Sequence, residues 1–171
     1  MTSAPAPAAS FAEFAALFHE EHRAVRDLLL ALADAFESRD LPRARALLAE
    51  TAAATGPHFR YEEEALYPAL VPVFGDAYVE QLFADHDLAI ASARRLAELA
   101  GRQELTDAEA AEAVRLVRGI LPHVSDCEGL SIMVELLPQA AVETLLAARA
   151  AARAAGLDLL AWAAAVRGRP A

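Results

Sequence analysis

The sequence predicts an all-α protein: an up-down-up-down antiparallel four-helix bundle with one or two extra C-terminal helices. Apolar residues recur three and four positions apart almost throughout the 171 residues, which is the spacing of an α-helical face. Ala and Leu dominate, whereas Val, Ile and Thr are too few and too little alternated for a sheet. Four long periodic segments are separated by short breaks, and short links favour antiparallel neighbours.

The first expected helix covers about 10–38 and is ended by the polar stretch "ESRDLP". The second covers about 41–73 and is ended by "VFGD". Within it, Gly56 and Pro57 should bend the helix axis, because proline lacks a donor N–H and its ring crowds the preceding turn.

The third expected helix covers about 76–100, where a glycine follows it. The fourth opens at Thr106, where "TDAE" is a capping box in which the Thr106 side chain caps one amide and Glu109 reaches back to another. Pro122 should kink this helix and Pro138 should end it.

The remaining residues complete the expected domain organisation. We expect a disordered arm over 1–9, the bundle over 10–138, and a C-terminal helical extension over 139–171 that packs on the bundle. Two short Ala-rich helices, at about 139–154 and 157–167, should form this extension.

Composition excludes several classes of partner. The net charge is −10 and no arginine-rich stripe offsets it, so a nucleic-acid backbone would be repelled. No run of eighteen apolar residues is present and the N-terminus lacks the pattern of a signal peptide, so we expect no membrane association. The single cysteine, Cys127, excludes a disulfide framework and fits a reducing compartment, so we expect a cytoplasmic protein.

Each of the four expected bundle helices places one histidine on its apolar stripe. One such histidine is usually a hydrogen-bonded core residue, but four at similar heights in four consecutive helices converge on the bundle axis. Buried imidazoles are costly without partners, and a metal is the best reason to bring them together. The four candidates are His22, His58, His86 and His123.

Carboxylates follow two of these histidines in a repeated Pro-His pattern, "PHFRYEEE" and "PHVSDCEG". Glu62 is four residues after His58, on the same helix face, and a cation is needed to neutralise it there. Glu128 is five residues after His123, about 140° around the helix, and its long side chain should swing inward beside the proline kink. Imidazoles and carboxylates together suit iron or manganese better than structural zinc.

Three weaker ligand candidates are His19, Glu63 and Cys127. We expect most carboxylates of the "EEE" run to be at the surface, and Cys127 is either a small buried hydrophobe or a site-facing thiolate. Tyr61 and Tyr67 flank the motif and either pack or hydrogen-bond to ligands. Trp162 is most simply a contact that docks the extension, although an interface of a homodimer is the alternative.

Over about residues 14–137 the sequence resembles the haemerythrin-like (HHE cation-binding) domain family. "HFRYEEEALYP" is similar to the second-helix signature of that family, and "EEHRAVRDLLLAL" is similar to its first. The resemblance implies a four-helix bundle around a non-haem di-iron centre, with two iron ions bridged by carboxylates and an oxygen; manganese is the alternative metal. Such centres bind O2 reversibly, sense oxygen or iron, or react with peroxide or nitric oxide.

The sequence departs from the family pattern at the third and fourth helices. The family carries two histidines four residues apart on its third helix, whereas Leu82 and Ile90 lie on either side of His86. On the fourth helix, the position that corresponds to Glu62, four residues after the histidine, is Cys127 and not a carboxylate. The next residue, Glu128, matches the position of the family's bridging aspartate. Three functions stay open: a protein that binds or senses O2, NO or iron, an oxygen-activating or peroxide-decomposing enzyme, and a metal-free interaction module.

Overall fold

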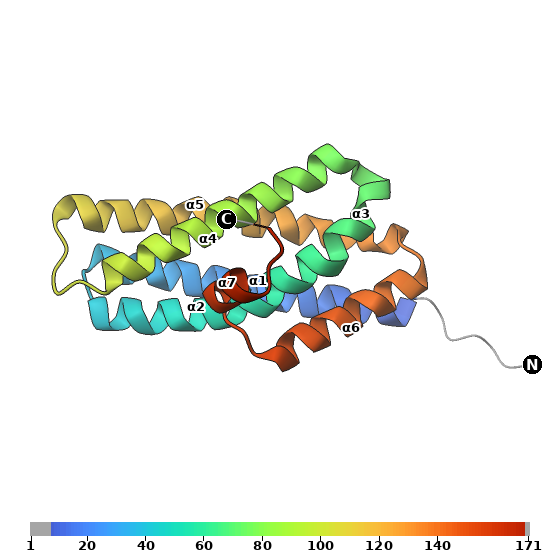
Figure 1. The fold of residues 1–171 in the computed structure, drawn as a ribbon, viewed down its shortest axis with the longest axis horizontal. Coiled ribbons are helices and arrows are strands. Elements are labelled where there is room, and N and C mark those ends of the chain that lie inside the picture. The colour runs from blue at the N-terminus through green and yellow to red at the C-terminus, as the bar shows by residue number, and fades with distance from the viewer. Residues whose placement is uncertain (1–7, 170–171) are drawn as a thin grey trace, which may run out of the picture.

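The computed structural model describes residues 8–169 and has an all-α fold, as predicted (Figure 1). In the bundle, α1 contacts α2 and α5, and α4 contacts the same two helices, so the four close into a ring. Residues 1–7 of the expected arm lie outside the described part, and its last two residues already belong to α1. The bundle helices are α1 (Ala8–Glu37), α2 (Leu41–Tyr61), α4 (Asp76–Ala100) and α5 (Asp107–Met133).

The expected second helix is divided into three parts. A π-helical segment, Glu62–Leu66, follows α2 and leads into α3 (Tyr67–Phe74). The N–H of Tyr67 donates to the carbonyl of Glu62, five residues back, which defines the wider turn. Single-turn π segments occur frequently at functional sites, and this one starts at the first glutamate of the "EEE" run.

The fourth helix begins as the capping box predicts and ends earlier than expected. The amide of Glu109 donates to the Thr106 hydroxyl at 3.3 Å, and the Thr106 amide donates to the Glu109 carboxylate at 2.9 Å. After Met133 the chain tightens into a 3-10 turn, and Leu137 is extended because the residue before a proline avoids the helical region.

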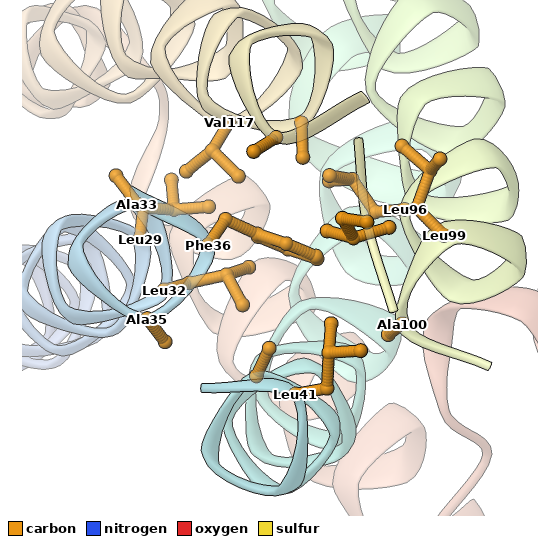
Figure 2. Packing of buried hydrophobic residues seen from close by; sticks show 14 of the residues in the cluster. Leu29, Leu32, Ala33, Ala35, Phe36, Leu41, Leu96, Leu99, Ala100 and Val117 are labelled. Carbon is orange, nitrogen blue, oxygen red and sulfur yellow. The ribbon is translucent and has the colours of Figure 1, made fainter. Parts of the chain in front are cut away.

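Two apolar clusters fill the ends of the bundle, and the four predicted histidines lie between them. The cluster at the α1–α2 and α4–α5 turns packs residues such as Phe36, Leu96 and Val117 around one axis (Figure 2). The cluster at the other end contains Phe14 and Tyr67, among others, and includes residues of the extension.

The extension packs on the outside of the bundle. Helix α6 (Gln139–Ala155) lies against α2 and α1, and α7 (Leu159–Ala165) lies against α2 and α4 (Figure 1). The second of these helices begins later than expected because Asp158 caps it, accepting from the amide of Ala161 at 2.8 Å. Trp162 is buried against the bundle in a cluster with Phe59.

Gly56 explains how closely the extension approaches α2. A Cβ added there would lie 2.7 Å from the amide nitrogen of Leu159 and closer still to the carbonyl of Leu157. Only glycine fits this crossing, so the residue is needed for packing as well as for any bend in α2. Among residues 8–169, no helix is long and apolar enough to cross a membrane.

Candidate metal centre

The predicted histidines meet in the middle of the bundle. The ring centroids of His22 and His58 are 4.6 Å apart, and those of His86 and His123 are 4.8 Å apart. Ligand-type atoms form two groups in which all members lie within 4.8 Å of one another: one is His22, Glu62 and Cys127, and the other is Glu62, His86 and His123. The two groups share Glu62, which therefore stands between two halves of one site.

Glu62 directs one carboxylate oxygen towards His58 and the other towards His86. Its Oε1 lies 3.3 Å from Nε2 of His58, and its Oε2 lies 3.2 Å from Nε2 of His86. The side chain is 0% exposed, and neither oxygen has a hydrogen-bond partner within the described residues. Burial alone would raise the pKa of Glu62, but the imidazoles of His58 and His86 hold it well below its usual value. A buried, ionised carboxylate needs positive charge beside it, which a protonated imidazole or a bound metal cation can supply.

On one side of the site, the ring nitrogens that face away from Glu62 are held by protein acceptors. Nδ1 of His22 lies 2.8 Å from the carbonyl of Phe18, which can only accept, so Nδ1 donates. Nδ1 of His58 lies 2.9 Å from Oε2 of Glu21, and the Tyr61 hydroxyl donates to the same oxygen at 2.9 Å. Such outer partners orient ligating histidines and leave Nε2 for a metal.

The other side has a similar arrangement around His86. Its Nδ1 lies 2.9 Å from Oε1 of Glu63, and the ring of Phe59 stacks on it at a centroid distance of 3.6 Å. The Tyr67 hydroxyl lies 2.9 Å from Nε2 of His86, on the side that faces the site. His123 has a looser carboxylate partner, with its Nδ1 3.6 Å from Asp85.

The protonation states of the histidines differ across the site. Burial and neighbouring imidazoles lower the pKa of His22 and of His123 to about 4, so both are neutral at pH 7. For His58, burial lowers the pKa, but the carboxylates of Glu62 and Glu21 outweigh burial and raise it to about 9. A metal that binds Nε2 of His58 must displace this proton.

Arginines of the extension neutralise the carboxylates behind His58 and His86. Glu21 accepts from Nε of Arg149 at 2.9 Å and from Nη1 of Arg153 at 3.2 Å. Glu63 accepts from Nε and Nη2 of Arg167 at 2.9 and 2.8 Å, and Arg167 is only 1% exposed. Sequence reasoning missed these positioning residues. For the contact with Glu21, the sequence did offer a signal: Arg149 and Arg153 are four residues apart and so lie on one face of an Ala-rich helix.

The structure does not bring four of the predicted residues into either group of ligand atoms, and one of them is His58, which contacts Glu62 through its Nε2 at 3.3 Å. Nε2 of His19 lies 2.6 Å from the Ser131 hydroxyl, Glu63 lies behind His86, and Glu128 is half-buried on α5. Their roles as ligands stay predictions. The expectation that most of the "EEE" run is at the surface was wrong: Glu62 and Glu63 are both buried, because one faces the histidines and the other is paired with an arginine.

Two oxidisable side chains also face the site. Cys127 is fully buried, with Sγ 3.4 Å from Nε2 of His123 and 3.7 Å from the Tyr67 hydroxyl. Burial and the charge of Glu62 raise the pKa of both Cys127 and Tyr67 well above their usual values, so both hold their protons at pH 7. Tyr61 and Tyr67 were expected either to pack or to hydrogen-bond to ligands. Both are buried, and their hydroxyls hydrogen-bond to Glu21 and to His86, respectively.

The donor set fits a metal cation. One group offers the His22 imidazole and the Cys127 thiol beside Glu62, with Nε2 of His58 3.3 Å from Oε1 of Glu62. The other group offers the imidazoles of His86 and His123 beside the same carboxylate. Imidazole and carboxylate donors suit iron or manganese, whereas a closed structural zinc site would offer four ligands to a single ion.

Comparison with known families agrees with this geometry. The Hemerythrin HHE cation binding domain matches residues 13–130, which covers the four bundle helices and the central histidines. Neither the curated proteins nor the solved structures give a significant match. The chain therefore belongs to the hemerythrin HHE cation-binding domain family, with an extension beyond the matched part.

Proposed function

We propose that this chain holds two non-haem iron ions, with manganese as the alternative metal, and binds or senses O2, nitric oxide or iron, or reacts with peroxide. One observation carries the proposal: Glu62 is fully buried, has no hydrogen-bond partner within residues 8–169, and presents one oxygen to each pair of histidines. A carboxylate in that position is stabilised by cations on both sides.

The protein groups around the pair have distinct roles in this proposal. The metal ions would supply redox chemistry and a coordination position for a small ligand. Glu21 and Glu63 fix the rings of His58 and His86 so that Nε2 faces inward. Tyr67 keeps an O–H donor 2.9 Å from Nε2 of His86, where a polar ligand can accept it.

An enzyme is the second candidate, and Tyr67 and Cys127 favour it. Both are buried at the site, and both side chains can be oxidised or donate a proton. A site built only to carry oxygen has no need of an oxidisable thiol next to its ligands. The enzyme would be an oxidoreductase that decomposes peroxide or activates oxygen on a small substrate. We also propose that this chain is located in the cytoplasm and forms a homodimer.

The first test is the metal content of the purified protein, together with its visible spectrum before and after peroxide. The proposal expects about two metal ions per chain and bands that change with peroxide, and the rate of peroxide loss separates enzyme from sensor. His58→Ala should lower the metal content sharply while most of the helix content is kept. A stable helical protein without metal would support the interaction module instead.

A further inference from the structure

An apolar cavity lies beside the candidate metal centre. This partly open cavity of about 200 Å³ is lined by residues from α1, α2, α4, α5 and α7. Val25 and Leu29 line it from α1, and Leu159 and Leu160 line it from the extension. Leu29 and Leu96, two of its walls, are seen in Figure 2. The cavity therefore extends from the apolar cluster at the α1–α2 turn towards the histidines.

The lining offers almost no polar group to an occupant. Its two threonines use their hydroxyls within α2: Thr51 donates to the carbonyl of Leu47 at 2.7 Å, and Thr55 donates to that of Thr51 at 2.8 Å. The one ionisable residue in the lining is His123, at the end nearest the metal centre. A charged molecule would lose its hydration without compensation, so the lining selects an uncharged one.

Small side chains keep the cavity open. Ala52 on α2, and Ala89 and Ala93 on α4, are among the lining residues that face each other across it. An unfilled apolar cavity destabilises a protein in proportion to its volume. Retaining one beside a reactive centre is typical of a ligand site.

The cavity touches two residues of the metal centre directly. His123 lines it and belongs to the group with Glu62 and His86. Phe59 also lines it, and its ring stacks on His86 and meets the ring of His123 edge-on at 5.9 Å. An occupant therefore contacts one imidazole directly and a second through a single aromatic ring.

A separate hollow already provides a polar route to the same histidine. It measures about 130 Å³ and is lined by Asp85 and Asp126 as well as by His123. Small polar molecules such as peroxide can approach through it, so the apolar cavity is not required for them.

We propose that the apolar cavity binds a small uncharged organic molecule, such as a single aromatic ring or a short hydrocarbon, against His123. An apolar cavity of about 150 Å³ binds benzene in another protein, so this one has room for about six to ten non-hydrogen atoms. Binding as such does not need the metal. The further point, that the occupant is the organic substrate or effector of the metal centre, rests on the proposed function.

The test uses toluene as the probe and benzoate as its charged counterpart. Binding to the full chain is followed by calorimetry and by the ligand's NMR signals, with and without metal. Ala93→Leu should fill the cavity and weaken toluene binding at least about tenfold, and Ala52→Leu should do the same from the opposite wall. Ala53→Leu, on the exposed side of α2, is the matched control and should bind toluene as the unaltered chain does.

Three results would overturn the proposal. The unaltered chain could fail to bind toluene, it could bind benzoate as tightly as toluene, or both filled variants could bind toluene as tightly as the unaltered chain does. Toluene should also shift the visible or EPR spectrum of the metal-loaded chain, and this shift should vanish in Ala93→Leu. If toluene binds but no metal loads, the cavity stands and the proposed function fails. If metal loads and toluene binds without a spectral shift, the link between cavity and metal centre is wrong.

Discussion

The two halves of the candidate metal centre are built alike but are buried to different depths. In each, a histidine that faces Glu62 is backed by a carboxylate, and an arginine from the extension neutralises that carboxylate. Behind His58, the side chains of Glu21 and Arg149 are each 15% exposed. Behind His86, the side chain of Glu63 is 6% exposed and that of Arg167 is 1% exposed.

This difference decides how strongly each half depends on its arginine. Water and a second arginine, Arg153, can replace part of what Arg149 supplies to Glu21. Glu63 has less access to water and would keep only the His86 ring, so loss of Arg167 would leave a nearly buried charge with little compensation. The extension, which lies beyond the matched family domain, therefore supports the two halves unequally.

The largest expected effect comes from the residue that both halves share. Glu62→Gln removes the charge that faces both histidine pairs, so metal affinity should fall by at least about 100-fold in both halves together. Metal titration with calorimetry measures this change. Glu64→Gln, at an exposed member of the same run, should keep full affinity, and retention of one metal ion by Glu62→Gln would show that the carboxylate is not shared.

Next in size is the loss of the buried arginine. Arg167→Gln strands the Glu63 carboxylate and should lower the free energy of unfolding by about 3–5 kcal/mol, measured with urea on the metal-free protein. The double variant Glu63→Gln with Arg167→Gln should recover part of this loss, because the Glu63 charge is removed as well, although Asp87 still loses its contact with Arg167. Arg43→Gln, at an exposed position of α2, is the control.

Arg149→Gln tests the more exposed half and should have a smaller effect. Glu21 keeps Arg153, Tyr61 and water, so we expect a loss of about 1–2 kcal/mol in the same unfolding experiment. The pKa of Glu21, which burial raises but His58 and Arg149 bring down to about 2, should move upward. A loss as large as that of Arg167→Gln would show that depth does not distinguish the halves.

The smallest effect, counted per pH unit, is the change in the free energy of unfolding of the metal-free protein with pH. His58 binds its proton more tightly in the folded state, so its contribution is present below pH 6.5 and is lost as pH rises through 9. His22 and His123 resist protonation in the folded state, so stability also falls as pH drops from 6.5 to 4. Each group contributes at most about 1.4 kcal/mol per pH unit. Urea midpoints should therefore peak near pH 6.5, and His58→Gln should remove the alkaline decline only.

The helices and the central histidines could be predicted from the sequence because both follow from local periodicity. Turns of 3.6 residues place His22 on the stripe of Phe14 and Phe18, and Glu62 on the face of His58, whatever the rest of the chain does. The capping box at Thr106 is equally local, and it is present in the structure as predicted.

The arginine contacts could not be predicted because they join distant parts of the chain. Arg149 is 128 residues from Glu21, and Arg167 is 104 residues from Glu63, so no local pattern relates them. The π-helical segment was also missed. It depends on a one-residue shift of backbone hydrogen bonds, which the pattern of apolar residues in "EEEALYP" does not reveal.

Gly56 gives a way to recognise the same architecture in other genomes. Because any larger residue there would push away the backbone at 157–159, a chain with this extension must keep glycine directly before its Pro-His pair. Bundles without such an extension are under no such constraint and can carry alanine, the better helix former. We therefore expect glycine at this position in every relative whose extension crosses α2 in the same way.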